Sequence, residues 1–324
     1  MYQISDNLLV NSQLKEKYQW LNELQDQNIS DFQINLFRVW CMDISNDLSL
    51  MAVGGISKDH TVFIYNQHSM ALCNQIYVTS HQVYLLLFSQ QDKYLCAGCY
   101  GKQILLWEVD DIKQIQNAKY KRVIQTEFGV IARILFFDNE RKLCFQGQSH
   151  LFIIDLEMNS QAKIIKINHK PQSFDINQSK LFEVGKSSVI YIRDICKDQI
   201  IRFICCNVSQ LDEIVVSKKN YFLVASSHQN IFCFNTINGK LLRKSRIFGR
   251  AQSIKLSEDD KFLTFVSMQA SVQLDYIHIL NLETDQLLLK YATQLSQPTF
   301  INKMMPKKFI FGKINSIEIW NLIL

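Results

Sequence analysis

The stretch Val62-Phe63-Ile64-Tyr65-Asn66 decides the fold, because the same five-residue pattern occurs seven times without gaps. Its first position is Val, Leu or Ile, its third is aliphatic or Cys, and its fifth is Asp, Asn or Glu. The other copies are Ile104 to Glu108, Leu151 to Asp155, Ile190 to Asp194, Ile231 to Asn235, Ile277 to Asn281 and Ile317 to Asn321. Successive copies start about 42 residues apart on average. A period of this length indicates a repeat architecture.

Each copy lies inside a longer repeated unit. An apolar segment precedes it, often ending in Gly as in Leu50 to Gly54, and a further strand pattern such as Cys41 to Ser45 precedes that one. A more polar run follows, for example Lys163 to Ile167, which is typical of an outer edge strand. Four antiparallel strands in each of seven repeats predict an all-β, seven-bladed β-propeller of four-stranded antiparallel blades.

The ends of the repeats resemble the WD-repeat family, in which an aromatic residue is followed by Asp. The degenerate copies of that ending are Tyr65-Asn66, Trp107-Glu108, Arg193-Asp194, Phe234-Asn235 and Trp320-Asn321. The resemblance covers roughly residues 28–324 and implies the propeller fold. It departs from the family because the structural Asp occurs only as Asp59 and the Gly-His pair is absent. We therefore expect packing, rather than the family's buried hydrogen-bond network, to stabilise the blades.

The two ends of the chain are expected to meet. The sequence stops three residues after Asn321, so the last blade needs an outer strand from elsewhere, and the spacing places that strand at residues 28–34. We predict a propeller over residues 28–324 and an N-terminal appendage over residues 1–27. Apolar residues at helical spacing predict a short helix in the appendage: Leu14, Tyr18, Leu21 and Leu24. A helix docked on the propeller, a partner-binding helix and a disordered tail remain alternatives.

The composition excludes several classes of protein. Of 324 residues, 48% are hydrophobic and 20% are charged, which is ordinary for a globular chain. We see no apolar run approaching the roughly 18 residues of a membrane helix and no signal peptide, and therefore expect a cytoplasmic protein. The nine cysteines are then expected to be reduced. A net charge of +5 is too small to imply nucleic-acid binding unless it gathers on one face.

Few motifs point to chemistry. Cys96-Ala97-Gly98-Cys99 is the one CxxC, but it lies on a predicted strand, whereas a redox pair needs a helix N-terminus to lower its thiol pKa. Cys96 is therefore expected in the core. No second CxxC and no His pair complete a zinc site, and G-x-S-x-G, P-loop, GxGxxG and HExxH motifs are absent from the sequence. We expect no catalytic residues, no cofactor and no metal, and hence no enzyme.

The turns between the second and third strands of the blades open on one rim and carry basic residues. The candidate partner-binding residues of this rim are Lys58, His60, Tyr100, Lys102, His150, Lys186, His228 and Lys313. Nearby loops add Arg38, Arg133, Lys170 and Arg250, opposed by Glu127, Asp212 and Glu213. Either these are ordinary solvated turns of a Lys-rich chain, or they form a basic mouth for an acidic peptide, a phosphopeptide or RNA.

A propeller without a catalytic set favours a non-catalytic scaffold or adaptor that binds other proteins, including acidic or phosphorylated segments. One alternative is binding of phosphoinositide or RNA through the basic rim, although the basic segment Arg243 to Arg250 does not match the paired-arginine motif of phosphoinositide-binding propellers. Another alternative is a propeller enzyme.

Overall fold

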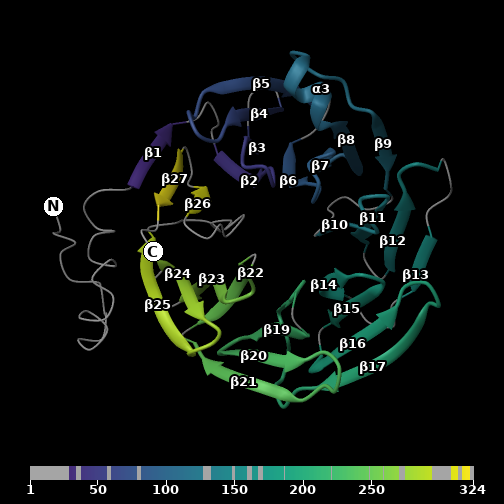
Figure 1. Ribbon diagram of the computed structural model, residues 1–324, viewed down its shortest axis with the longest axis vertical. Helices are drawn as coiled ribbons and strands as arrows, with labels where there is room; N and C mark the ends of the chain where they lie inside the picture. The colour runs from purple at the N-terminus through teal and green to yellow at the C-terminus, as the bar shows by residue number, and fades with distance from the viewer. Residues whose placement is uncertain are drawn as a thin grey trace.

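The repeated segments form separate antiparallel sheets that stand in a ring around a common centre, as Figure 1 shows. The computed structural model describes the greater part of the chain. The described residues are 29–33, 38–56, 60–78, 82–126, 133–147, 150–158, 163–166, 171–185, 187–219, 221–247, 249–257, 259–269, 274–293, 308–312 and 316–321.

Six of the sheets are four-stranded blades whose strands follow one another in sequence. Blade 1 contains β2 (Arg38–Ile44), β3 (Leu50–Ile56), β4 (Thr61–Asn66) and β5 (Leu72–Tyr77). Blade 2 contains β6 (Val83–Phe88), β7 (Tyr94–Cys99), β8 (Gln103–Glu108) and β9 (Arg122–Gln125). Blade 3 contains β10 (Ile134–Phe137), β11 (Lys142–Gln146), β12 (His150–Asp155) and β13 (Lys163–Lys166).

The other three blades repeat this arrangement. Blade 4 contains β14 (Pro171–Asn177), β15 (Lys180–Gly185), β16 (Val189–Asp194) and β17 (Gln199–Cys205). Blade 5 contains β18 (Glu213–Val216), β19 (Phe222–Ser227), β20 (Asn230–Asn235) and β21 (Leu241–Arg246). Blade 6 contains β22 (Arg250–Leu256), β23 (Phe262–Gln269), β24 (Leu274–Asn281) and β25 (Gln286–Thr293). The β-propeller with four-stranded antiparallel blades is thereby confirmed.

The prediction of seven such blades is wrong, because the described part of the chain forms six. The remaining sheet has three strands in the described part of the chain, in the order β1 (Ile29–Gln33), β27 (Ser316–Asn321) and β26 (Lys308–Gly312). In the repeat pattern, the segment in the place of this sheet's inner strand is Thr299 to Met304, which lies outside the described residues. Its apolar pattern is the weakest of the inner segments, since Asn302 and Lys303 interrupt it.

The two ends of the described chain meet in this three-stranded sheet. β1 pairs antiparallel with β27, with Ile29 opposite Trp320 and Gln33 opposite Ser316. β1 lies within residues 28–34, where the sequence predicts the strand that closes the ring. The domain boundaries at 1–27 and 28–324 stay predictions, and the helix predicted for residues 1–27 lies outside the described residues.

The core lies between blades, which explains why the middle strands are apolar on both faces. β7 is buried along its whole length, and Trp107 on β8 is fully buried against residues of both blade 1 and blade 2. The same kind of cluster joins blades 4 and 5, where Ile204 of β17 packs with Phe232 of β20. Similar clusters join blades 2 and 3, 3 and 4, and 5 and 6, so blades 2 to 5 each bury both faces against their neighbours.

Polar clamps between neighbouring inner strands supplement this packing. The carboxylate of Asp43 on β2 accepts the backbone N–H of Phe88 on β6 at 2.5 Å. Asp175 on β14 accepts the N–H of Val216 on β18 at 2.8 Å. Because both acceptors are charged and largely removed from water, each clamp fixes one blade against the next.

Blade 2 carries an insertion that the repeat pattern does not predict. The short helix α3 (Val109–Gln114) separates β8 from β9 and is the one helix in the described residues. Asn74 on β5 of blade 1 donates to the carbonyls of Ile112 and Ile115 at 2.7 and 2.8 Å, which docks the helix on the neighbouring blade. No helix in the described part of the chain is long and apolar enough to cross a membrane.

Candidate functional site

Five of the eight candidate rim residues fall within the described part of the chain, and they are spread around the ring. His60 precedes β4 in blade 1, Tyr100 and Lys102 lie in the β7–β8 turn of blade 2, His150 begins β12 of blade 3, and His228 lies in the β19–β20 turn of blade 5. The structure therefore brings Tyr100 and Lys102 together in one turn. Lys58, Lys186 and Lys313 lie outside the described residues.

Tyr100 belongs to a cluster of three aromatic side chains that joins blades 1 and 2. Its ring centroid lies 5.5 Å from that of Trp40 and 5.0 Å from that of Tyr84, with interplanar angles of 56° and 68°. Trp40 and Tyr84 are half-buried, whereas Tyr100 is 45% exposed. Edge-to-face contacts of this kind hold the rings in place, so Tyr100 presents an ordered aromatic surface to solvent.

Trp40 and Tyr84 reach the rim because each sits at a β-bulge. The pairing of β2 with β3 shifts register between Val39 and Cys41, and the pairing of β6 with β7 shifts between Val83 and Leu85. An extra residue at the start of an inner strand turns its side chain out of the regular alternation. Neither aromatic is among the rim residues predicted from the sequence. Their equivalent places directly after Val39 and Val83 are the signal that marks them.

Lys102 is exposed, and its backbone is held in the left-handed region. Its φ is 60°, and its carbonyl accepts the N–H of Thr126 at 2.7 Å. Gly101 precedes it, while the N–H of Tyr100 donates to the carbonyl of Gln82 at 3.1 Å. These bonds tie the turn to both of its flanking segments and keep Tyr100 and Lys102 in fixed relation.

The three candidate histidines have different surroundings. His60 is half-buried with φ of 51°, and its carbonyl accepts the N–H of Val78 at 3.0 Å. His150 lies with its ring 6.4 Å from that of Phe152 on the same strand. His228 is exposed in its turn.

Arg133 and Arg250 of the neighbouring loops are engaged by polar groups. Arg250 Nη2 lies 2.7 Å from Asp212 Oδ1. Arg133 donates to Ser173 Oγ at 2.6 Å. The carboxylate of Glu213 accepts the backbone N–H groups of Ser253 and Ile254, each at 3.0 Å. Among the described rim residues, Lys102 therefore supplies exposed positive charge, while Arg133 and Arg250 make contacts between blades.

The charged groups of the inner strands converge near Lys255 on β22. Burial lowers the pKa of Lys255, and the nearby Arg133 lowers it further, whereas Glu213, Asp43 and Asp175 act in the opposite direction. These residues come from blades 1, 3, 4, 5 and 6, so they surround the centre of the ring. The three carboxylates already accept backbone N–H groups, and this cluster therefore holds blades together.

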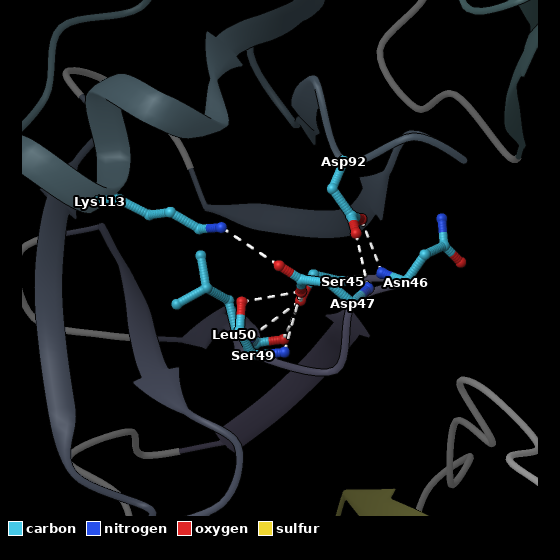
Figure 2. A network of polar contacts seen from close by, with 7 residues as sticks. All are labelled: Ser45, Asn46, Asp47, Ser49, Leu50, Asp92 and Lys113. Carbon is cyan, nitrogen blue, oxygen red and sulfur yellow. Dashed lines mark hydrogen bonds and ion pairs between the residues drawn. The ribbon is translucent and has the colours of Figure 1, made fainter.

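A second polar network lies in the turns between the first and second strands of blades 1 and 2, as Figure 2 shows. The carboxylate of Asp92 accepts the backbone N–H groups of Asn46 and Asp47 at 2.6 and 2.7 Å. Lys113 on α3 lies with Nζ 3.2 Å from Asp47 Oδ2. The network thus joins blade 1, the β6–β7 turn and the insertion.

Asp47 also organises its own turn. Its carboxylate accepts the hydroxyls of Ser45 and Ser49 at 2.6 and 2.7 Å, and Ser45 Oγ in turn accepts the N–H of Leu50 at 2.9 Å. Partial burial opposes the charge of Asp47, but the hydrogen bonds from Ser45 and Ser49, with Lys113, lower the pKa of its carboxyl well below the usual range. Asp47 is therefore a fully ionised structural anchor.

The two cysteines of the CxxC are buried in blade 2. All nine are free thiols, and Cys96 and Cys99 are buried on β7. Burial raises the pKa of Cys99 to about 12 and that of Cys96 well above the ordinary value. The prediction that Cys96 lies in the core is confirmed. No group of three or more His, Cys, Asp or Glu side chains in the described residues is arranged to hold a metal ion.

Comparison with known protein families matches residues 31–66 to the WD40 repeat (WD domain, G-beta repeat). This range begins in β1 and ends with the last residue of β4. No curated protein matches the chain. The matched repeat and the arrangement of the blades together support a WD-repeat propeller.

Proposed function

We propose that the protein is a non-catalytic scaffold that binds another protein at the rim formed by blades 1 and 2. WD40 propellers typically serve as protein-interaction scaffolds, and the matched repeat, residues 31–66, runs from β1 through the first three strands of blade 1. The observation that carries the proposal is the exposed ring of Tyr100 resting on Trp40 and Tyr84. Tyr and Trp dominate the energetics of protein interfaces, because they bury much area and lose little conformational entropy.

The positive charge of the rim indicates which kind of segment the partner would present. Lys102 lies two residues after Tyr100 and is exposed. An acidic or phosphorylated segment would place its charge near Lys102 and an apolar side chain on Tyr100. Lys58, Lys186 and Lys313, which the sequence assigns to the same rim, would add attraction within a Debye length of about 8 Å.

The test compares two sets of charge reversals in the full-length chain. The rim variant combines Lys58→Glu, Lys102→Glu, Lys186→Glu and Lys313→Glu, and a second rim variant carries Tyr100→Ala. The control reverses the charges of Lys163 and Lys166 on the outer strand β13. Proteins captured by the wild-type chain should be retained by the control and lost by both rim variants, while the melting temperature stays close to that of the wild type.

Other outcomes would redirect the assignment. Partner binding that survives in the rim variants and fails in the β13 variant would place the interface on the side of the propeller. Salt-dependent binding of RNA or of phosphoinositide vesicles that requires the rim lysines, without any protein partner, would favour the alternative function. Turnover of a small ester or sugar would favour an enzyme.

A further inference from the structure

The outer strand β17 of blade 4 differs from the other outer strands in what it exposes. It pairs with β16 on one side and, within the described residues, with no strand on the other. Ile200, Ile201 and Phe203 are 44, 50 and 65% exposed, and Arg202 between them is exposed as well. Phe203 is thus a large apolar side chain turned to solvent from an open sheet edge.

Two other outer strands, β5 and β13, are protected in ways that β17 is not. The edge of β5 is covered by the insertion, where Asn117 Oδ1 accepts the N–H of Tyr77 at 3.2 Å. β13 has four residues and begins and ends with Lys. Short strands, lysines and covering loops are the usual means by which proteins block edge-to-edge pairing. β17 has seven residues and one charge.

The neighbouring outer strand extends the surface and sets its charge. A Cβ placed on Gly239, in the turn before β21, would lie 3.4 Å from Ile204 Cγ1 and 3.9 Å from Arg202 Nη1. This turn therefore rests against β17, and Figure 1 shows both strands on the outer circumference of the ring. Leu241 and Leu242 on β21 are 51 and 56% exposed. Neither strand contains Asp or Glu, and β21 adds exposed Lys244 and Arg246.

We propose that β17 is a docking strand for an extended segment of a partner protein in which apolar and acidic residues alternate. The segment would add to blade 4 as a further strand, taking main-chain hydrogen bonds from the open edge of β17. Its apolar side chains would cover Phe203 and Ile200, and its carboxylates would face Arg202 and the basic residues of β21. This interface is separate from the rim around Tyr100.

The open strand edge favours a protein segment over a lipid surface. Apolar side chains among basic residues also occur on membrane-binding surfaces. Burying β17 in hydrocarbon, however, would leave its outward N–H and C=O groups without partners, which membranes do not tolerate. An added strand pairs those groups while it covers the same side chains. A second copy of the chain fits less well, because antiparallel pairing centred on Arg202 would set two arginines directly opposite each other.

The test uses a fluorescein-labelled peptide of about the length of β17 in which valine and glutamate alternate, titrated against the full-length chain. We expect saturable binding that weakens about tenfold in Arg202→Glu and in Phe203→Glu. Tyr221→Glu is the matched control, since Tyr221 is 71% exposed in the turn between β18 and β19. It should bind as the wild type does. Hydrogen exchange should slow at the amides of β17 when the peptide is bound.

Several results would overturn the proposal. These are an absence of binding up to about 1 mM peptide, equal binding by Phe203→Glu, or equal binding of a peptide with lysine in place of glutamate. Phe203-dependent binding to phosphatidylserine vesicles without binding to the peptide would assign the surface to lipid. Dimerisation of the wild-type chain that Phe203→Glu abolishes would assign it to a second copy. Circular dichroism melting establishes that each variant is folded.

Discussion

Glu183 and Arg193 form an ion pair in the interior of blade 4, with Arg193 Nη2 3.6 Å from Glu183 Oε1. Glu183 lies on β15 and is fully buried, and Arg193 on β16 is 9% exposed. Burial raises the pKa of Glu183 to about 7, although the positive charge of Arg193 acts against the shift. Arg193 also reaches Asp198, with Nη1 3.0 Å from Oδ1. The arginine is thus shared, and the buried carboxylate is only partly compensated.

This pair makes the stability of the fold depend on pH near neutrality. The pKa of Glu183 is raised above its ordinary value of 4.5, so ionising it costs the folded state free energy. Stability should therefore fall as pH rises from about 4.5 to about 7. Glu183→Gln removes the ionisable group. We expect its free energy of unfolding, relative to that of the wild type, to rise by roughly 1–3 kcal/mol between pH 5 and pH 8. Urea denaturation at the two pH values measures the difference.

The matched control is Glu283→Gln, because Glu283 pairs with Lys261 at 3.6 Å at the surface. The free energy of unfolding of Glu283→Gln should change with pH as that of the wild-type chain does. If Glu183→Gln also followed the wild type between pH 5 and pH 8, the carboxyl of Glu183 would not titrate as its burial requires.

The hydrogen bonds from the backbone of blade 1 to Asp92 give a second prediction. Asp92→Asn keeps the side-chain shape and tolerates the φ of 57° at this position. It replaces one acceptor oxygen by an amide that faces the N–H of Asn46 or Asp47. We expect a loss of about 1–3 kcal/mol in the free energy of unfolding. Asp110→Asn on the exposed face of α3 is the control. It should lower the free energy of unfolding by only about a few tenths of a kcal/mol.

The insertion gives a third prediction. Asn74 donates to two carbonyls at the end of α3, and its Oδ1 accepts the N–H of Asn117 at 3.0 Å. Asn74→Ala removes all three bonds and should release residues 109–121 from blade 1. Limited proteolysis should then cut this segment about tenfold faster, because local opening needs less free energy. Unchanged cleavage would show that Trp107 and the buried Ile112 hold the insertion without Asn74.

The blades could be predicted from the sequence because their middle strands are buried on both faces. Such strands are continuous apolar runs, and all of Ile104 to Glu108 lies within β8. The prediction of a seventh four-stranded blade relied on the segment around Asn302 and Lys303, where the apolar pattern is the weakest of the inner segments. The helix α3 was not predicted either. The 47-residue step from Trp107 to Ile154 indicates extra residues there but does not indicate their structure.

The candidate site was predicted only in part, because its contacts join separate repeats. Tyr100 stands out in its turn, but its partners Trp40 and Tyr84 depend on β-bulges that residue type does not reveal. The same holds for the polar clamps. The expectation of stability from packing alone overlooked Asp43, whose carboxylate meets Phe88 only after two inner strands lie side by side.

The thiols offer a chemical test of which strands are buried. Cys73, Cys196 and Cys205 are exposed, and the other thiols are buried or half-buried. A thiol reagent should therefore label these three rapidly in the native protein and all nine after denaturation. Mass spectrometry of peptides locates the labels. Rapid labelling of Cys96 in the native protein would contradict its burial on β7 and would support the hypothesis that the CxxC is a redox pair.

The pairing of β1 with β27 gives the last prediction, which concerns how the ring is held closed. Five residues of β1, Ile29 to Gln33, lie opposite Trp320 to Ser316, so the two ends of the chain share one sheet. Deleting residues 1–36 removes this strand and leaves the outer edge of β27 open. Unpaired edges template association with other chains, and the opened ring also loses its lateral support. We expect a lower melting temperature, loss of a single cooperative transition and aggregation by light scattering. Deleting residues 1–24 keeps β1 and should leave melting unchanged. If the longer deletion melted cooperatively at the temperature of the full-length chain, β1 would not contribute to closing the ring.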